Sequence, residues 1–169
     1  MDTLEAIRTR RSIRKYTSQP VSEEIINELL TAAMYAPSAG NEQPWHFVVI
    51  KERQTLDAIS VFHPHGKMLK NAPAAILVCG DPSLEEFKGR WMLDCSAATQ
   101  NILLAAHAKG LGAVWVGIYP EPARIDGIRK LVILPDHILP LSLIPVGYPA
   151  EHIPQPNRFN AARIHYEKW

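Results

Sequence analysis

The chain has 169 residues, of which 47% are hydrophobic and 21% charged, a size and composition typical of one soluble domain and not of a disordered chain. Its 18 Lys and Arg residues nearly balance 17 Asp and Glu residues, so a formal charge of +1 indicates neither a nucleic-acid nor an acidic-membrane partner. Cys79 and Cys95 lack the spacing of a zinc site, and no apolar run suits a signal core or membrane span. We therefore expect one cytoplasmic domain over residues 1–169.

Helical and strand periods alternate along the chain. Strand-like runs rich in β-branched and aromatic residues lie between amphipathic stretches that begin with capping residues and end at glycine or proline. In chain order the pattern predicts a short helix capped by Asp2 or Thr3, a helix from Ser22 that Pro37 stops, a strand over 45–50, a helix over 53–60, a strand over 74–80, a helix over 90–109 that Gly110 caps, a strand over 112–118, a helix near 124–131 and a strand over 141–147.

Two of these elements indicate how the layers are arranged. The strand over 74–80 is apolar on both faces, as expected for a strand inside a sheet that is covered on both sides. The helix over 90–109 carries almost no charge after Asp94, so it is buried either in the core or against another subunit. We expect an α/β or α+β layered sandwich with helices on both faces of the sheet.

Proline is the compositional excess, with 14 residues that concentrate in the last third of the chain. The stretch 148–157 carries three of them and is expected to run extended over a surface. Residues 159–169 are amphipathic and aromatic, which is atypical of a disordered tail. We expect this end of the chain to dock on another surface.

A basic run at Arg10-Arg11-Ser12-Ile13-Arg14 is the first candidate site. Guanidinium groups present fixed forks of N–H donors that suit a phosphomonoester, and Ser12 adds a hydroxyl. The alternative is a solvated cationic helix end that the helix dipole favours. A nucleic-acid site is disfavoured because the net charge of the chain is near zero and it has no aromatic-rich basic strand.

The loop over 37–43 and the glycine at Gly117 are the second and third candidates. The amides of Asn41 and Gln43 could bind the polar edge of a flat heterocycle, although the loop could equally be a capped turn. Gly117, inside a strand, would let a ligand approach the backbone, and the alternative is a bulge or tight packing.

Several motifs are excluded. Gly110-Leu111-Gly112 follows a helix and lacks the third glycine of a dinucleotide fingerprint. His63-Pro64-His65 has no carboxylate or cysteine at ligand spacing, so no metal site is expected. No nucleophile elbow, Walker loop or pair of catalytic carboxylates is present. If the chain is an enzyme, it has no catalytic residue of its own to offer, and a cofactor must supply the chemistry.

Taken together and in order, four segments resemble the FMN-dependent nitroreductase family over the whole chain. They are Arg10 to Tyr16, Ala36 to Trp45, Gly110 to Gly117, and Arg158 to Trp169. The resemblance implies an α+β fold, a three-layer αβα sandwich with a mixed central sheet and helices on both faces. It also implies an intertwined homodimer with FMN at the subunit interface and a C-terminal arm, about residues 148–169, that packs on the partner.

The resemblance also assigns roles to individual residues. Arg10, Arg11, Ser12 and Arg158 would bind the FMN phosphate, and Arg14 would lie near the pyrimidine edge of the flavin, where a cation favours negative charge on the ring. Backbone around Val116 and Gly117 would approach the flavin N5. The ring would be covered from the opposite subunit, and Lys67 would add a contact; the covering residues are Pro37, Ser38, Ala39, Asn41 and Gln43.

The expected activity is electron transfer from NADH or NADPH through FMN to a small acceptor such as a nitro-aromatic or a quinone. Two features depart from the family pattern. Many relatives carry an acidic residue where this chain has Val116, and the chain is short, without the insertions that cover the substrate side of the flavin. The alternatives are a specialised flavin enzyme of the same fold, such as a dehalogenase or a flavin-fragmenting enzyme, and a non-enzymatic anion-binding module.

Overall fold

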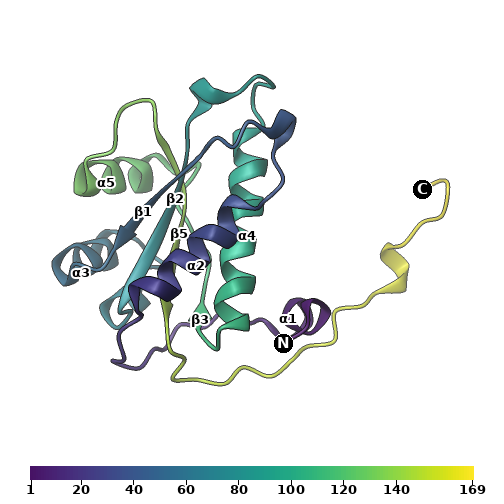
Figure 1. Cartoon of the computed structure of the whole chain (residues 1–169), viewed down its shortest axis with the longest axis horizontal. Coiled ribbons are helices and arrows are strands. Elements are labelled where there is room, and N and C mark those ends of the chain that lie inside the picture. The colour runs from purple at the N-terminus through teal and green to yellow at the C-terminus, as the bar shows by residue number, and fades with distance from the viewer.

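An antiparallel sheet forms the centre of the molecule (Figure 1). The computed structural model describes residues 1–169, and the strand order is β1-β2-β5-β3, with β4 also paired to β5. Every pair of strands is antiparallel, so the sheet of this chain is not the mixed sheet that the family resemblance implied. The one parallel element is an isolated bridge between Ser12 and Ala113, which does not extend into a strand. The strands are β1 (Trp45–Ile50), β2 (Ala74–Gly80), β3 (Gly112–Ala113), β4 (Val116–Gly117) and β5 (Leu139–Gly147).

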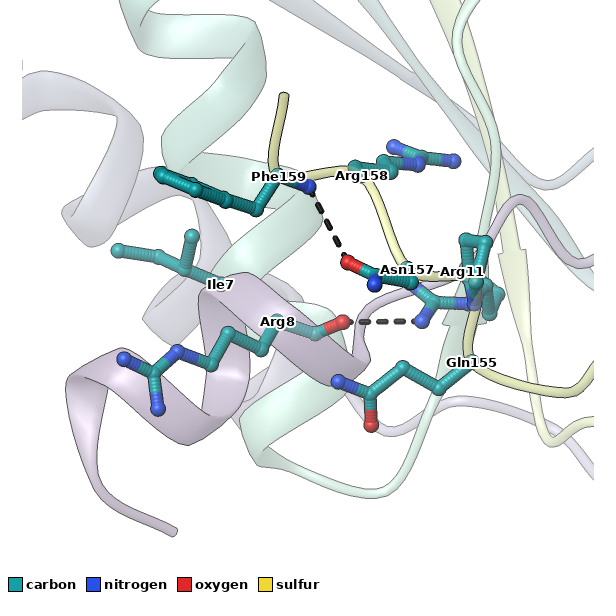
Figure 2. A pocket seen from close by; sticks show the side chains of 8 residues that line it. Ile7, Arg8, Arg11, Gln155, Asn157, Arg158 and Phe159 are labelled. Carbon is teal, nitrogen blue, oxygen red and sulfur yellow. Dashed lines mark hydrogen bonds between the residues drawn. The ribbon is translucent and has the colours of Figure 1, made fainter. Parts of the chain in front are cut away.

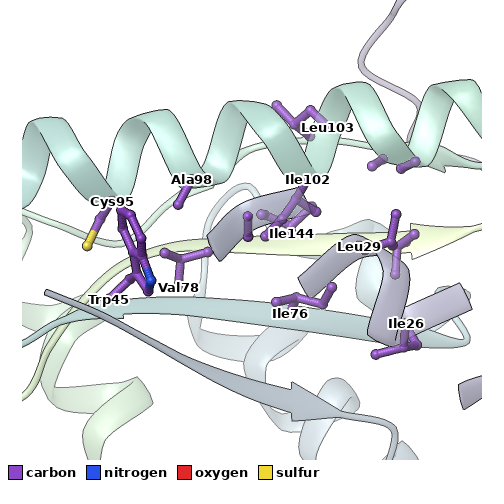
Figure 3. Close-up of a cluster of buried hydrophobic side chains, with 14 of the residues drawn as sticks. Ile26, Leu29, Trp45, Ile76, Val78, Cys95, Ala98, Ile102, Leu103 and Ile144 are labelled. Atoms are coloured by element: carbon purple, nitrogen blue, oxygen red, sulfur yellow. The ribbon is translucent and has the colours of Figure 1, made fainter. Parts of the chain in front are cut away.

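Helices cover both faces of this sheet, so the predicted three-layer sandwich is confirmed. One core cluster joins the sheet to α2 and α4 and includes Leu29, Ile76 and Ile102 (Figure 3). A second cluster joins the opposite face to α3 and α5. None of the helices has the length and hydropathy that a membrane span needs. The helices are α1 (Thr3–Thr9), α2 (Glu23–Met34), α3 (Arg53–Phe62), α4 (Trp91–Ala108) and α5 (Pro122–Val132).

The helix boundaries follow from capping residues in the sequence. The Asp2 side chain accepts a hydrogen bond from the Leu4 N–H at the start of α1, and Ser22 accepts from the Ile25 N–H at the start of α2. Gly110 adopts φ +76° just after α4, the left-handed conformation predicted for it. The helix predicted near 124–131 begins two residues earlier, at Pro122, which suits the first turn because proline has no N–H to lose there.

The strand predicted over 112–118 is split into β3 and β4. Both parts keep one continuous register along β5, and in that register Val114 stands opposite Pro145. Because proline has no N–H, the hydrogen bond that would bridge the gap cannot form. The other proline of β5, Pro140, lies beside a register shift between Val78 and Cys79. The prolines of this central strand thus coincide with its irregularities.

The C-terminal arm leaves the sheet and passes the end of α1 (Figure 1). Its first residues are fixed, because the Ala150 N–H donates to the Lys15 carbonyl. Beyond that point it is extended apart from a short 3-10 turn, η4 (Ala161–Arg163). The side chain of Phe159 is 77% exposed and Trp169 is fully exposed. The predicted extended path is confirmed, and the aromatic end has no docking surface on its own chain.

Candidate functional site

A group of arginines lines a cavity of about 680 Å³ between α1 and the C-terminal arm (Figure 2). Arg8 and Arg11 reach it from α1 and the residues after it, and Arg158 reaches it from the arm. The remaining lining residues are Ile7, Gln155, Pro156, Asn157 and Phe159. The sequence predicted Arg11 and Arg158 to belong to one site, and the fold brings them to one cavity from segments far apart in the chain.

No carboxylate neutralises this cavity. The lining arginines Arg8, Arg11 and Arg158 form no ion pair, nor does Arg10, which lies near them but does not line the cavity. Lys51, Arg53, Lys109 and Arg129, by contrast, each pair with a carboxylate. Burial lowers the pKa of Arg10, and the nearby cations Arg158 and Arg11 lower it further. Cations that repel one another without a carboxylate in the chain gain stability from a bound anion.

Arg11 braces the cavity wall. Its guanidinium donates to the carbonyls of Arg10 at 2.5 Å, Arg8 at 2.9 Å and Pro154 at 3.2 Å. These bonds tie the end of α1 to the arm and use three of the five N–H donors of Arg11. The guanidinium groups of Arg10 and Arg158 have no hydrogen-bond acceptor in the chain, so all their donors are available to an anion.

Ser12 and Arg14 follow Arg11 in the chain, and Ser12 bridges to Ala113 of β3. The Ile13 N–H donates to the Ala113 carbonyl, and a Cβ on Gly112 would lie 2.5 Å from the Ile13 side chain, so glycine lets this segment press against β3. The Ser12 hydroxyl makes no hydrogen bond within the chain. Arg14 is exposed, and its backbone N–H donates to Glu151 Oε1 at 2.6 Å.

Glu151 is a residue that sequence reasoning missed. Its carboxylate accepts from the backbone N–H groups of Arg14 and Lys15, at 2.6 and 3.1 Å, and so anchors the start of the arm beside the basic run. A lone acidic residue in a proline-rich stretch gives no signal of this role, because its partners are backbone groups more than 130 positions earlier.

Gly117 lies in β4, whose only strand partner is β5, so the other edge of β4 pairs with no strand. It does not have the positive φ that requires glycine, and a Cβ built on it would meet no atom of the chain within 4 Å. Ile118 donates to the Leu141 carbonyl, so the alternation of an antiparallel ladder turns the N–H and C=O of Gly117 away from β5. Neither packing nor backbone strain within the chain therefore explains a glycine here, and the approach of a ligand stays a prediction.

The loop over 37–43 is rigidly held at the N-terminal end of α4. Asp94, 5% exposed, accepts from the Ala39 N–H at 3.1 Å, and Glu42 accepts from the Phe87 N–H at 2.5 Å. Gln43 donates to the Asn41 side chain at 2.8 Å, so these two amides bind each other. Pro37 and Ser38 begin the loop, and the Ser38 hydroxyl accepts from the Gln43 N–H. The alternative of a capped turn describes the loop within one chain.

The predicted site residues fall into two groups at opposite ends of α4. Asp94 holds the loop near the start of the helix, whereas His107 near its end contacts Thr9 of α1 at 2.7 Å. A helix rise of about 1.5 Å per residue separates Asp94 from His107 by about 20 Å. One chain therefore does not gather the basic run and the loop around one small ligand. Lys67, exposed at the start of η2 (Lys67–Lys70), contacts neither group.

The chain matches the model of the nitroreductase family over residues 7–62 and 61–148. A Methanothermobacter thermautotrophicus protein with the provisional name NADH dehydrogenase/NAD(P)H nitroreductase is 56% identical over 100% of this chain and 88% of its own length. A Parabacteroides distasonis structure of the same provisional name superposes with TM-score 0.95 at 47% identity, covering 99% of this chain and 98% of that one.

A third relative has been solved with a cofactor. The Desulfovibrio desulfuricans structure, described as a nitroreductase in complex with FMN, superposes with TM-score 0.86 at 33% identity over 100% of this chain and 98% of its own. A full-length match of fold and order, together with the family model, leaves one conclusion: the chain belongs to the nitroreductase family.

Proposed function

We propose that this protein is an FMN-dependent NAD(P)H oxidoreductase that works as a homodimer on small electron acceptors such as nitro-aromatics and quinones. The observation that carries the proposal is the unneutralised arginine cavity. Ser12 follows its lining residue Arg11 in the chain and bridges to Ala113, four residues before Gly117. The names of the relatives, an NAD(P)H nitroreductase and an FMN complex, agree with it.

The residues present fit FMN. Arg10 and Arg158 would bind the phosphate, with the Ser12 hydroxyl as a further donor and Arg11 as the brace of the site. From Ala113 to Gly117 the strand extends at most about 13 Å, a distance that the ribityl chain and ring of FMN can span. The position that a Cβ of Gly117 would take has no atom within 4 Å, so a flat ring could lie against that face of the backbone.

When bound, FMN supplies the redox chemistry, taking a hydride equivalent from NAD(P)H and passing the electrons to the acceptor. The protein positions the ring and sets its electrostatics. Exposed Arg14 would place a cation near the pyrimidine edge of the ring, where it favours negative charge. The backbone at Val116 and Gly117 would hold the N5 side of the ring, and Lys67 would add a polar contact.

A second copy of the chain would complete the site. The loop over 37–43 lies about 20 Å along α4 from the basic run, so Pro37, Ser38, Ala39, Asn41 and Gln43 would cover the FMN of the other subunit. An apolar groove of about 260 Å³ between α1, α2 and α4, which Ala6 and Leu104 line, remains open to a partner. The exposed aromatic arm is the segment that would cross to it.

The test is to purify the protein and record its visible spectrum, its mass in solution and its oxidation of NADH and NADPH with a quinone or nitro-aromatic. We expect a yellow dimer that turns over both classes of acceptor. Arg10→Ala is expected to weaken FMN binding by about 1.5–3 kcal/mol, the worth of one charged hydrogen bond. Lys130→Ala, which removes an exposed cation on α5, is the matched control.

A protein that stays colourless after addition of FMN contradicts the proposal. Salt-sensitive binding of polyanions without flavin would instead indicate an anion-binding module. A flavin-loaded protein that does not oxidise NAD(P)H with any of these acceptors would indicate a specialised flavin enzyme.

A further inference from the structure

The backbone carbonyl of Gly117 has two donors that the proposed function leaves unused. His63 Nε2 lies 2.9 Å from the Gly117 oxygen, and Arg124 Nη1 donates to the same oxygen at 3.1 Å. His63 is the C-terminal cap of α3, and Arg124 lies in the first turn of α5. Two helices on one face of the sheet thus converge on a single peptide oxygen at the sheet edge.

The protonation of His63 is fixed by its contacts. The His65 backbone N–H, which can only donate, binds His63 Nδ1 at 3.1 Å, so Nδ1 accepts and Nε2 carries the hydrogen that Gly117 receives. His63 is 1% exposed, and this burial lowers its pKa. The hydrogen bond to Gly117 acts in the opposite direction, whereas Arg124 and His65 lower the pKa further. The ring is a neutral donor at neutral pH.

Packing of α3 against α5 sets the distance between these two donors. A Cβ on Gly127 of α5 would lie 2.7 Å from a ring carbon of Phe62, the last residue of α3. Glycine therefore lets α5 approach the end of α3 closely enough for Arg124 and His63 to share one acceptor. Arg124 forms no ion pair, so its guanidinium is not directed elsewhere by a carboxylate.

Gly117 is half-exposed, so its carbonyl does not need two side-chain donors merely to satisfy a buried acceptor. Glycine has the largest conformational freedom of any residue, and β4 is only two residues long, with a gap in its pairing before it. The Gly117 carbonyl shares its peptide plane with the Ile118 N–H, which donates to Leu141, so His63, Arg124 and this bond together hold that plane. The open Gly117 N–H belongs to the preceding peptide plane, which can then turn only through the φ and ψ of Gly117 itself.

We propose that His63 and Arg124 are positioning residues that hold the Gly117 backbone in the orientation in which it meets the flavin ring. This proposal deepens the proposed function and depends on it for the identity of the ring. The two residues act through the Gly117 peptide, so their removal is expected to lower kcat and leave the KM for NAD(P)H and the retention of FMN near their wild-type values.

The variants are His63→Leu and Arg124→Met, which remove one donor each, and His63→Gln, which keeps an N–H near the position of Nε2. Arg129→Met is the matched control, because Arg129 lies on the same helix and also donates to carbonyls, those of Pro135 and Ile138, away from Gly117. The first measurement is amide hydrogen exchange without FMN, with β2 as internal reference.

We expect exchange of the Ile118 and Tyr119 amides, which donate to the Leu141 carbonyl, to become about fivefold faster in His63→Leu and Arg124→Met, the factor for one ordinary hydrogen bond, and to recover in His63→Gln. With FMN bound, kcat falls in the same two variants and recovers in the third. Unchanged exchange in both variants, an equal acceleration in Arg129→Met, or faster exchange with unchanged kcat overturns the proposal.

Failure of the proposed function gives a different result. In that case the wild-type protein itself neither retains FMN nor oxidises NAD(P)H, whatever the exchange of the Gly117 segment shows. Faster exchange in the two variants would then support only the fixing of Gly117 and overturn its assignment to a flavin.

Discussion

Three buried acidic residues near the start of α4 have different environments. Burial alone would raise the pKa of Glu85, but the backbone N–H groups of Trp91, Gly89 and Arg90 outweigh it and lower the pKa. The pKa of Asp81 is also lowered, by bonds from Ser83 that outweigh burial. Burial raises the pKa of Asp94, and the charges of Glu42 and Glu85 raise it further. The Ala39 N–H and Arg90 oppose this shift without cancelling it. Only Asp94 is therefore destabilised as an anion.

We predict opposite effects of neutralising Glu85 and Asp94. Glu85→Gln is expected to lose about 1.5–3 kcal/mol of unfolding free energy at pH 7, because a charged acceptor of two N–H groups is lost. Asp94→Asn is expected to raise it, because Oδ1 still accepts from Ala39 while the charge disappears. Chemical denaturation at pH 7 measures both.

The pH dependence supplies the control. Glu85 contributes stability above its ordinary pKa of 4.5 that is lost as the pH falls through its lowered value, so its variant approaches wild type in acid. Wild-type Asp94 gains stability as the pH falls through its raised pKa, so the advantage of Asp94→Asn also shrinks in acid. An Asp94→Asn protein less stable than wild type at pH 7 would contradict this account.

Gly117 allows a test that separates binding from folding. Gly117→Ala adds a methyl group where the chain has no atom within 4 Å, so unfolding free energy should be unchanged or rise by about 0.5–1 kcal/mol. The same methyl would meet the flavin ring, and FMN retention should fall at least tenfold. Fluorescence titration measures FMN affinity, and thermal melting of the FMN-free protein measures the change in stability.

The matched variant for Gly117→Ala is Gly89→Ala. A Cβ at Gly89 also meets nothing within 4 Å, but this residue has φ +83° and lies away from β4. It should cost stability and leave FMN retention intact. Equal FMN retention in wild type and Gly117→Ala would show that no ligand approaches this backbone.

At the scale of the element, α2 is the helix that its own sequence specifies most clearly. Ser22 caps its N-terminus, Glu23 and Glu24 follow in the first turn, and Ile26, Leu29 and Ala33 form its buried face. Ser22→Ala should cost about 1 kcal/mol of unfolding free energy, measured by urea denaturation. Ser22→Asp, which keeps an acceptor, is the control and should stay near wild type.

The strand interrupted between β3 and β4 shows where element prediction fails. The run Gly112 to Ile118 has a strand composition throughout, and nothing local marks the gap. The gap exists because Pro145, on another strand, stands opposite Val114 in the register. Register is a property of the pair, so no inspection of either segment alone reveals it.

At the scale of the whole molecule, the C-terminal arm is the segment whose removal should change assembly. A chain that ends after Ile153 retains Glu151 and its bonds to Arg14 and Lys15 but loses the exposed residues from Pro154 onward. We expect this truncation to be a monomer without FMN, whereas Arg158→Ala stays dimeric and loses only FMN affinity. Light scattering and flavin absorbance measure both properties.

Two other outcomes of the truncation would contradict this expectation in different ways. A truncated chain that remains a dimer with bound FMN would show that neither the arm nor Arg158 is needed. A truncated dimer without FMN would confine the role of the arm to the phosphate site.

The sequence by itself determined the layers, nearly all helix and strand boundaries and the extended arm. These depend on periodicity, capping residues and proline, which act over a few neighbouring positions. Tertiary structure decided which arginine is free to bind and which braces the wall, since Arg11 donates to the Pro154 carbonyl far along the chain.

Only tertiary structure also revealed the roles of Asp94, Glu151 and His63. Each of them binds a backbone group that is remote in sequence, and any residue can supply a backbone N–H or C=O, so the partner leaves no mark in the sequence. In the sequence, His63 belongs to a His-Pro-His motif that has no further metal ligand at suitable spacing. The fold instead gives its ring one carbonyl to hold, at the glycine where this family member meets its cofactor in our proposal.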